Sequence, residues 1–217
     1  MQSALFDDIT ERGSPNEDLG PGTAILRGFA LNEQSAILDG MYAVASKSPF
    51  RHMVTPGGFR MSVGMTNCGP FGWVTDRKGY RYEKVDPETN TAWPAMPEPF
   101  LEVAMAAAAA AGFPDFMPDA CLVNRYEPGA RLTMHQDKNE RDFSNPIVSV
   151  SLGLPAVFLF GGLERQDRTI RLPVAHGDVL VWGGPARLRY HGIMPLKDGI
   201  HPLTGAYRFN LTFRKAA

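Results

Sequence analysis

A succession of short β-prone segments fills the C-terminal half of the chain and constrains its fold more than any other feature. After Asp119, segments rich in β-branched and aromatic residues alternate with glycine or proline, as expected of strands joined by tight connections. In chain order they read CLVNRY, LTMHQD, IVSVSLG, AVFLF, RTIRLPV, GDVLVWGG and YRFNLTFR. About seven strands preceded by helices predict an α+β, mostly β fold, a sandwich or barrel buttressed by N-terminal helices. A jelly roll, which has about eight strands, fits best.

Two segments before this region are predicted to be helices. Residues 31–47 carry apolar side chains at helical spacing. Residues 99–111 are built on alanines, with Pro99 suited to a first turn and Gly112 placed to end the helix. Both precede the strands, which is the order expected when helices cover one side of a β domain.

The chain is expected to form one domain preceded by an arm. Residues 1–20 are polar and rich in glycine, proline and acidic side chains, which predicts a flexible arm. Residues 49–93 lose all periodicity and carry glycines, aromatic rings and many cations. No compositional boundary interrupts residues 21–217, so a single domain is predicted, with its core over residues 119–217.

Composition restricts the partners and the compartment. The formal net charge of −1 rules out a global basic field, so any nucleic-acid surface has to be local. Cys68 and Cys121 lie outside any CxxC motif and are too few for a disulfide framework, which indicates a cytoplasmic protein. No basic start is followed by an apolar leader, and the alanine run at 106–111 is too short for a bilayer, so no membrane partner is expected.

His135 and Asp137, in the sequence HQD, are candidate metal ligands. If a strand over 132–137 continues through both, residues two apart project from the same face and share one space. An HxD pair alone is a weak signal, because most such pairs are surface polar residues. His191 follows the strand GDVLVWGG after a short loop, where β topology can return it to the same site. His176 lies in the segment AHGD, where a role in a tight turn is favoured.

Two histidines and one carboxylate allow several functions. They are the ligand set of non-haem Fe(II) oxygenases, which leave the other positions of an octahedron open. The same ligands with a water suit a zinc-dependent hydrolase. A third alternative is a non-catalytic jelly-roll binding module whose histidines are structural. The trio alone does not decide among these.

The C-terminal strand RFNLTFR favours the oxygenase. Its apolar face, expected in the core, consists of Phe209, Leu211 and Phe213. Its polar face consists of Arg208, Asn210, Thr212 and Arg214. On a half-exposed strand this face would simply be solvated, but two guanidinium groups can converge on a small dianion if the strand curves inside a barrel. Asn124 and Tyr126, one hairpin upstream of His135, can point the same way. A dicarboxylic co-substrate beside a metal would use this arrangement, which a zinc hydrolase leaves unexplained.

The sequence HQD with a distant histidine, and a strand fitting RxNxTxR, resemble the Fe(II)/2-oxoglutarate dioxygenases of the AlkB alkylation-repair type. The resemblance covers nearly the whole chain from about residue 20 and includes SPFRHMVTPGGFRMSVGMTNCG, DPETNTAWPAMP, PDACLVNRY, SVSLGLPAVFLFGG and HGDVLVWGG. It implies a double-stranded β-helix, a form of jelly roll, in agreement with the strand pattern.

The resemblance also implies an activity and its site. It implies that Fe(II) is held by His135, Asp137 and His191. It implies that 2-oxoglutarate is bound by Asn124, Tyr126, Arg208, Asn210 and Arg214, with Arg208 on the distal carboxylate and Arg214 on the carboxylate beside the keto group. The implied reaction uses O2 to hydroxylate an alkyl group on a base nitrogen of single- or double-stranded DNA, or of RNA, and releases formaldehyde, succinate and CO2. This is direct-reversal DNA repair, for which no obligate protein partner is evident and a monomer is expected.

Residues 49–93 are expected to be the nucleotide-recognition segment. A base in a duplex has to be extruded to reach the metal. Trp73 and Tyr80 match family positions that can stack on it, although composition alone favours a core position for Trp73 beside a glycine turn. Thr55, Met65 and Arg165 match family positions at the substrate mouth. The cations that can contact phosphates, although such runs are usually solvated, are Arg51, Arg60, Arg77, Lys78, Arg81 and Lys84.

Asn139 departs from the family pattern. In relatives with the pattern HxDxDE, the residue two after the metal-binding aspartate is acidic, whereas here it is the neutral Asn139. An acidic group favours a cationic methylated base, because opposite charges attract strongly in a dry site. We therefore predict that Asn139, as a substrate contact, weakens the preference for cationic over neutral lesions.

Overall fold

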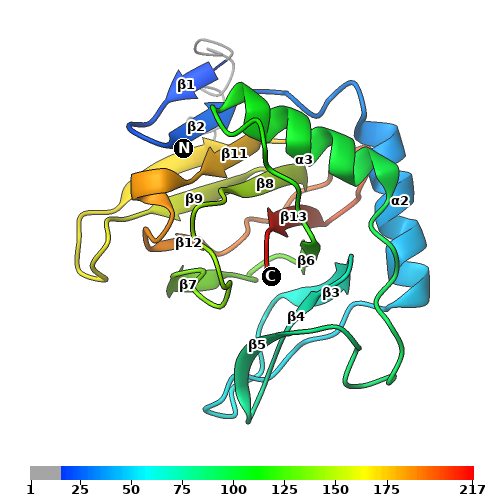
Figure 1. The fold of residues 1–217 in the computed structure, drawn as a ribbon. Coiled ribbons are helices and arrows are strands. Elements are labelled where there is room, and N and C mark those ends of the chain that lie inside the picture. Colours follow the sequence, from blue (N-terminus) through cyan, green and yellow to red (C-terminus); the bar gives the residue numbers. More distant parts are fainter. Residues whose placement is uncertain (1–15) are drawn as a thin grey trace.

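The strands of the protein form two sheets packed face to face. The computed structural model describes residues 16–217, so the expected arm at residues 1–20 lies mostly outside the described residues. Across that described range, a seven-stranded and a four-stranded sheet make the sandwich, and a two-stranded hairpin lies beside it (Figure 1). The predicted jelly roll, mostly β with helices on one side, is confirmed.

Neighbouring strands in each sheet are antiparallel. The larger sheet has the order β1 (Asn16–Asp18), β2 (Thr23–Leu26), β11 (Val179–Trp182), β8 (Ile147–Gly153), β13 (Arg208–Arg214), β6 (Ala120–Tyr126) and β3 (Gly64–Cys68). The smaller sheet has the order β10 (Ile170–Val174), β9 (Ala156–Phe160), β12 (His191–Ile193) and β7 (Leu132–His135). The hairpin consists of β4 (Gly72–Asp76) and β5 (Gly79–Glu83).

Helices α2 (Gln34–Lys47) and α3 (Glu98–Ala110) cover the outer face of the larger sheet (Figure 1). The prediction for α3 is confirmed, since Pro99 lies in its first turn and Gly112, with a φ of +90°, follows its end. Helix α2 begins later than the predicted residue 31, because the Leu31 N–H closes a turn on the Gly28 carbonyl at 3.1 Å. Neither helix, and no other helix in residues 16–217, is long and apolar enough to cross a membrane.

Two apolar layers hold the elements together. The first lies between the helices and the larger sheet and contains the predicted apolar face of β13; there Phe213 meets Phe100 of α3 edge-on, with ring centroids 6.0 Å apart. The second lies between the two sheets, where the centroids of Phe158 and Trp182 are 5.7 Å apart. Strand β13 is buried along its whole length, so its polar face is turned into the sandwich and not into solvent.

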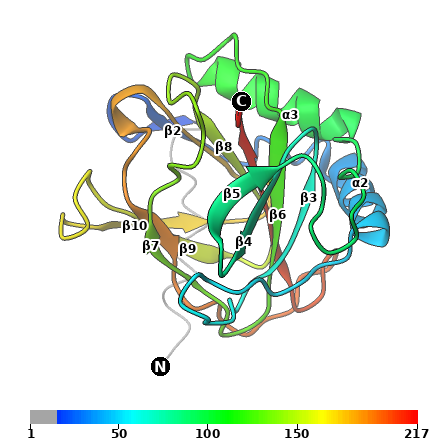
Figure 2. The same ribbon diagram turned by 60° about the horizontal axis from the view of Figure 1, so that its bottom comes forward.

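Residues 49–93 contain β3 and the hairpin β4–β5, which the sequence did not predict. In Figure 2 the hairpin stands in front of β6 and beside β7, at one end of the sandwich. It is tied to its own segment by the indole of Trp93, which donates a hydrogen bond to the Glu83 carbonyl at 2.9 Å. The hairpin thereby borders the space between the sheets.

Candidate metal and co-substrate site

A cavity of about 320 Å³ lies between the two sheets and is bordered by the hairpin β4–β5. All the residues predicted to hold metal or co-substrate line it: Asn124, Tyr126, His135, Asp137, His191, Arg208, Asn210 and Arg214. So do all the predicted substrate contacts: Thr55, Met65, Trp73, Tyr80, Asn139 and Arg165. Residues far apart in the chain therefore face one space.

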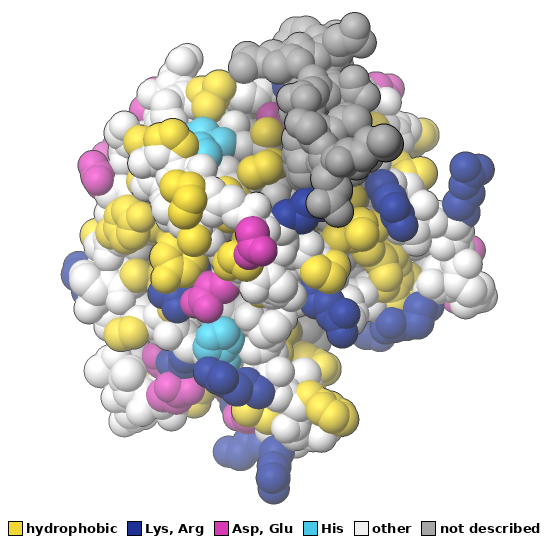
Figure 3. All heavy atoms as spheres, turned by 180° about the vertical axis from the view of Figure 1, so that it is seen from behind, with side chains coloured by type: hydrophobic (Ala, Val, Ile, Leu, Met, Phe, Trp, Pro, Cys, Tyr) yellow, Lys and Arg dark blue, Asp and Glu magenta, His cyan; other side chains and the backbone are white. Residues whose placement is uncertain are grey.

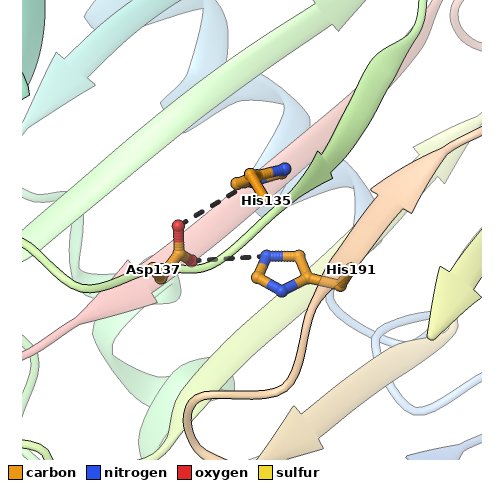
Figure 4. Close-up of side chains that lie close together, drawn as sticks. All are labelled: His135, Asp137 and His191. Carbon is orange, nitrogen blue, oxygen red and sulfur yellow. Dashed lines mark ion pairs between the residues drawn. The ribbon is translucent and has the colours of Figure 1, made fainter. Parts of the chain in front are cut away.

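His135, Asp137 and His191 converge at one side of this cavity (Figure 4). His135 ends β7, and its Cα partner on β12 is His191. The Asp137 carboxylate lies 3.9 Å from His135 Nε2 through Oδ1 and 3.6 Å from His191 Nε2 through Oδ2. Asp137 lies beyond the end of β7, so the strand argument that linked it to His135 was wrong. The loop that follows β7 brings the carboxylate back to the imidazole.

Backbone carbonyls set the orientation of both imidazole rings. Nδ1 of His135 lies 2.8 Å from the Thr133 carbonyl, and Nδ1 of His191 lies 3.0 Å from the Arg189 carbonyl. A carbonyl can only accept, so each Nδ1 carries the proton and each Nε2 offers its lone pair to the space beside Asp137. One atom of each side chain lies within 4.8 Å of the others, an arrangement that can hold a metal ion.

The charges of the trio match those of metal ligands. Burial in the cavity wall, with His191 as the next cause, lowers the pKa of His135 to about 4, so its imidazole is neutral. Burial alone would raise the pKa of Asp137, but the charge of Arg214 outweighs it and holds that pKa well below its usual value. Two imidazoles and one carboxylate with open positions are the donor set that suits Fe(II).

Arg214 pairs directly with the carboxylate of the trio. Its Nε and Nη2 donate to Asp137 Oδ2 at 2.9 and 2.6 Å. The guanidinium thus stands at the side of the candidate metal site, where a carboxylate bound next to the metal would meet it. Position and charge both fit the co-substrate carboxylate expected beside the keto group.

Arg208 is a buried cation with unused hydrogen-bonding capacity. Its side chain is about 1% exposed, and it packs over the Tyr126 ring with its central carbon 4.8 Å from the centroid. One nitrogen donates to Ser151 Oγ at 3.1 Å, whereas Nε and Nη1 have no partner. A buried guanidinium left in this state is costly, so an anion in the cavity is the missing partner that its chemistry requires.

Asn210 and Asn124 form a polar support between the two arginines. The Asn210 amide donates to Ser149 Oγ at 2.8 Å, and its oxygen accepts from Thr212 at 2.9 Å. Asn124 donates to the same Asn210 oxygen at 3.4 Å and leaves its own Oδ1 without a partner. Asn210 is therefore held by protein groups, whereas Asn124 keeps an acceptor free.

Trp73 and Tyr80 form an aromatic pair at the hairpin side of the cavity. Their rings are stacked, with centroids 5.7 Å apart and planes 20° from parallel. The Trp73 indole N–H donates to Asn139 Oδ1 at 3.1 Å. An indole N–H can only donate, so this contact orients the Asn139 amide with its oxygen toward Trp73 and leaves its NH2 group as a donor.

Three side chains behind the site were missed by sequence reasoning. Glu140 is buried and ion-paired with Arg187 at 3.0 Å, and the Tyr82 hydroxyl donates to it at 2.6 Å. Arg187 also donates to the Asp137 carbonyl at 2.8 Å and thereby fixes the loop after β7. Tyr, Glu and Arg in polar segments look like surface residues, so no spacing in the sequence indicated that these three are buried together.

The cations predicted to contact phosphates differ in whether they are already paired with a carboxylate. Arg51 is paired with Asp86 at 2.7 Å, and Arg81 is paired with Asp76 at 2.9 Å and with Glu83 at 2.6 Å. The exposed cations of this segment are Arg60, Arg77, Lys78 and Lys84. Figure 3, the side opposite to Figure 1, shows Lys and Arg side chains projecting at its lower end, the level of the hairpin.

Fold and site together define a class of enzyme. A double-stranded β-helix with two histidines and one carboxylate beside unpartnered buried guanidinium nitrogens is the site of an Fe(II)/2-oxoglutarate-dependent oxygenase. The chain belongs to the 2OG-Fe(II) oxygenase superfamily, whose family model matches residues 22–214.

Individual relatives narrow this class. The chain is 61% identical over 98% of its length to the alpha-ketoglutarate-dependent dioxygenase AlkB of Escherichia coli, of which it covers 98%. It is 35% identical over 56% of its length to the human nucleic acid dioxygenase ALKBH1, of which it covers 31%. The solved structure of OsALKBH1 superposes with a TM-score of 0.81 at 29% identity, covering 93% of this chain and all (100%) of that one. The protein is thus an AlkB-type Fe(II)/2-oxoglutarate-dependent dioxygenase, which displaces the zinc hydrolase and the non-catalytic module.

Proposed function

We propose that this enzyme removes alkyl groups from base nitrogens of DNA, or of RNA, by oxidative demethylation, and so repairs the base directly. The observation that carries the proposal is that the stacked pair Trp73 and Tyr80 borders the same cavity as His135, Asp137 and His191. A flat aromatic platform beside an oxidising metal suits a planar substrate with a methyl group at its edge. The human relative is named a nucleic acid dioxygenase, which supports a nucleic acid as that substrate.

In this proposal each residue of the cavity wall has a role. Nε2 of His135, Nε2 of His191 and the Asp137 carboxylate hold Fe(II). Arg208 binds the distal carboxylate of 2-oxoglutarate and Arg214 the carboxylate beside its keto group, with Asn124, Tyr126 and Asn210 completing that subsite. When bound, Fe(II) and 2-oxoglutarate would supply the electrons that activate O2. The products would be succinate, CO2 and a hydroxylated alkyl group, which leaves the base as formaldehyde.

The protein's own contribution is to bind and orient the reactants. The apolar walls exclude water, and the carbonyls of Thr133 and Arg189 keep both Nε2 atoms aimed at the same point. Residues 49–93 act as the nucleotide-recognition segment, with Trp73 and Tyr80 on the extruded base and the exposed cations on phosphates. Residues 119–217 form the catalytic core. Extrusion costs a few kcal/mol, and less for a damaged base that pairs poorly.

Mass spectrometry of a methylated oligonucleotide tests this function. After incubation with the protein, Fe(II), ascorbate and 2-oxoglutarate, we expect each lesion to lose the mass of one CH2 unit, with succinate formed in parallel. The His135→Ala variant is the matched control and should leave the oligonucleotide unchanged. Succinate formation without any mass loss on single-stranded DNA, double-stranded DNA or RNA would overturn the choice of substrate.

We also infer that the protein works as a cytoplasmic monomer. Its two cysteines, Cys68 and Cys121, are buried free thiols, as expected in a reducing compartment. The cavity is complete within one chain, so the site needs no second copy. Light scattering coupled to size exclusion should give a mass near 23.8 kDa; a stable dimer would contradict the inference.

A further inference from the structure

Glu140 is a buried carboxylate that the proposed chemistry does not use. Its side chain is about 1% exposed, although it lies in the loop just after Asp137. Burying an ionised carboxylate is costly unless it is paired and hydrogen-bonded. Here the Tyr82 hydroxyl donates to Oε1 at 2.6 Å and Arg187 Nη2 lies 3.0 Å from Oε2. Glu140 does not line the cavity, so it can affect a ligand only through its neighbours.

Arg214 is the neighbour that connects Glu140 to the site. Its Nε lies 3.6 Å from Glu140 Oε1 and donates to Asp137 Oδ2 at 2.9 Å. One guanidinium is therefore held between two carboxylates, one in the cavity wall and one behind it. Because the guanidinium is attracted to both carboxylates, its position depends on both of them. Without Glu140, Asp137 alone would set that position.

Tyr82 connects the same carboxylate to the hairpin. It lies on β5 directly opposite Trp73 of β4, so its position follows that of the aromatic platform. Burial raises the pKa of Tyr82 well above its usual value, with Arg214 acting in the opposite direction. The phenol therefore keeps its proton, and its O–H donates the hydrogen bond to Glu140. A continuous series of contacts thus runs from the hairpin through Glu140 to Arg214.

We propose that Glu140 is a positioning residue for Arg214, and that the Tyr82–Glu140 hydrogen bond makes the affinity for 2-oxoglutarate depend on how the hairpin β4–β5 is seated. The proposal rests on the proposed function, in which Arg214 binds a carboxylate of the co-substrate. Loss of the hydroxyl leaves Glu140 with a weaker anchor, and loss of the charge on Glu140 leaves Asp137 as the remaining carboxylate that pairs with Arg214. Either change reduces the readiness of Arg214 for the incoming anion.

A double-mutant cycle measures this dependence. The dissociation constant of 2-oxoglutarate is determined by anaerobic calorimetry on Fe(II)-loaded protein without nucleic acid. We expect Glu140→Gln to weaken binding about tenfold and Tyr82→Phe about threefold, the scale of a lost charge-assisted hydrogen bond felt indirectly. Because both act through one path, the double variant should bind no more weakly than Glu140→Gln alone.

Glu83→Gln is the matched control. Glu83 lies on β5 next to Tyr82, but its carboxylate pairs with Arg81 and takes no part in the contacts around Glu140. This variant should change the dissociation constant of 2-oxoglutarate by about twofold at most.

If Tyr82→Phe lowers the unfolding temperature but leaves the affinity unchanged, the cluster is structural and the proposal is wrong. That variant alone decides the question if Glu140→Gln does not fold. If the two fold-changes in dissociation constant multiply in the double variant, Tyr82 does not act through Glu140 and the proposed connection is wrong. Failure to demethylate any oligonucleotide would contradict the proposed function, but it would not affect the measured dependence of 2-oxoglutarate affinity on Glu140 and Tyr82.

Discussion

At the scale of single residues, Arg208 shows how a ligand site can be recognised before its ligand is bound. Burial lowers the pKa of this arginine, with Tyr126 acting in the opposite direction. Its guanidinium nonetheless stays charged, because the usual pKa of arginine is so high. A buried charge with two unpartnered nitrogens is unfavourable until an anion pairs with it, so the proposed binding of 2-oxoglutarate would recover part of that cost.

Replacement of Arg208 by lysine should therefore affect co-substrate binding more than turnover. Lysine keeps the charge but cannot make the paired hydrogen bonds of a guanidinium to a carboxylate. We expect Arg208→Lys to raise the KM for 2-oxoglutarate at least about tenfold and to change kcat less. Initial rates of succinate formation at varied 2-oxoglutarate measure both. Arg171→Lys, at an exposed position of β10, is the control and should behave as wild type.

Replacement of Asn139 by aspartate should change the choice of lesion. The Trp73 indole can donate to either side chain, but aspartate presents a negative acceptor to the cavity where asparagine presents an NH2 donor. We expect Asn139→Asp to raise the rate on 1-methyladenine, which is cationic, relative to 3-methylthymine, which is neutral, by about tenfold. Competition between the two lesions in equal amounts gives the ratio directly. An unchanged ratio would reject the role assigned to Asn139.

Residue patterns predicted the ligands but not their support. The alternation of RFNLTFR placed Arg208 and Arg214 on one face of a strand, and both line the cavity. Spacing did not explain Asp137, which lies beyond the end of β7, and His191 was added from its place after a distant strand. Glu140 and Arg187 follow no such spacing. Their burial depends on how the loop after β7 folds back against the end of β13, which is a tertiary property.

At the scale of elements, alternation and length decided what could be predicted. Strands β8 and β13 are long and strongly β-prone, and both were found. Strand β12 has only three residues, and it exists because it pairs with β7 and β9 on either side. Strands of the 49–93 segment likewise depend on pairing with distant partners, as β3 does with β6. Local sequence carries little information about such strands.

Gly72 tests how the hairpin is anchored. A Cβ at this position of β4 would overlap the indole ring of Trp93, which holds the Glu83 carbonyl of β5. We expect Gly72→Ala to lower the free energy of unfolding by about 1–3 kcal/mol, the usual cost of overpacking. Denaturant unfolding measures it. Gly64→Ala on β3 is the matched control, because its Cβ would meet the nearest atoms at 3.6 Å, an ordinary contact, and should cost less than about 1 kcal/mol. Equal effects of the two changes would contradict this account.

At the scale of the whole molecule, the sandwich is closed by ligands as well as by its apolar layers. The trio joins two strands of the smaller sheet, β7 and β12, to the loop after β7, and Arg208 and Arg214 belong to the larger sheet. A metal and a dicarboxylate bound between them would therefore link both sheets. Such binding stabilises the folded state, because the unfolded chain has no assembled site.

Thermal unfolding should report this linkage. With Fe(II) and 2-oxoglutarate each at about a hundred times its dissociation constant, each should add about 2.7 kcal/mol of stability. For a chain of this length that corresponds to a rise in Tm of about 10 °C or more for both together, under argon. A chelator should reverse the rise. His135→Ala should abolish it, and a rise that persists in this variant would show that the ligands bind elsewhere.

Strand β13 packs against helices with one face and lines the cavity with the other, which carries Arg208 and Arg214. A slip of one residue in its pairing would exchange the two faces. The phenylalanines would then point into the cavity, and the guanidinium groups would lie in the apolar layer under the helices. Molecules that made this error would be unable to capture the keto-diacid. On the proposed function, 2-oxoglutarate would thus stabilise only those chains in which β13 pairs in the correct register.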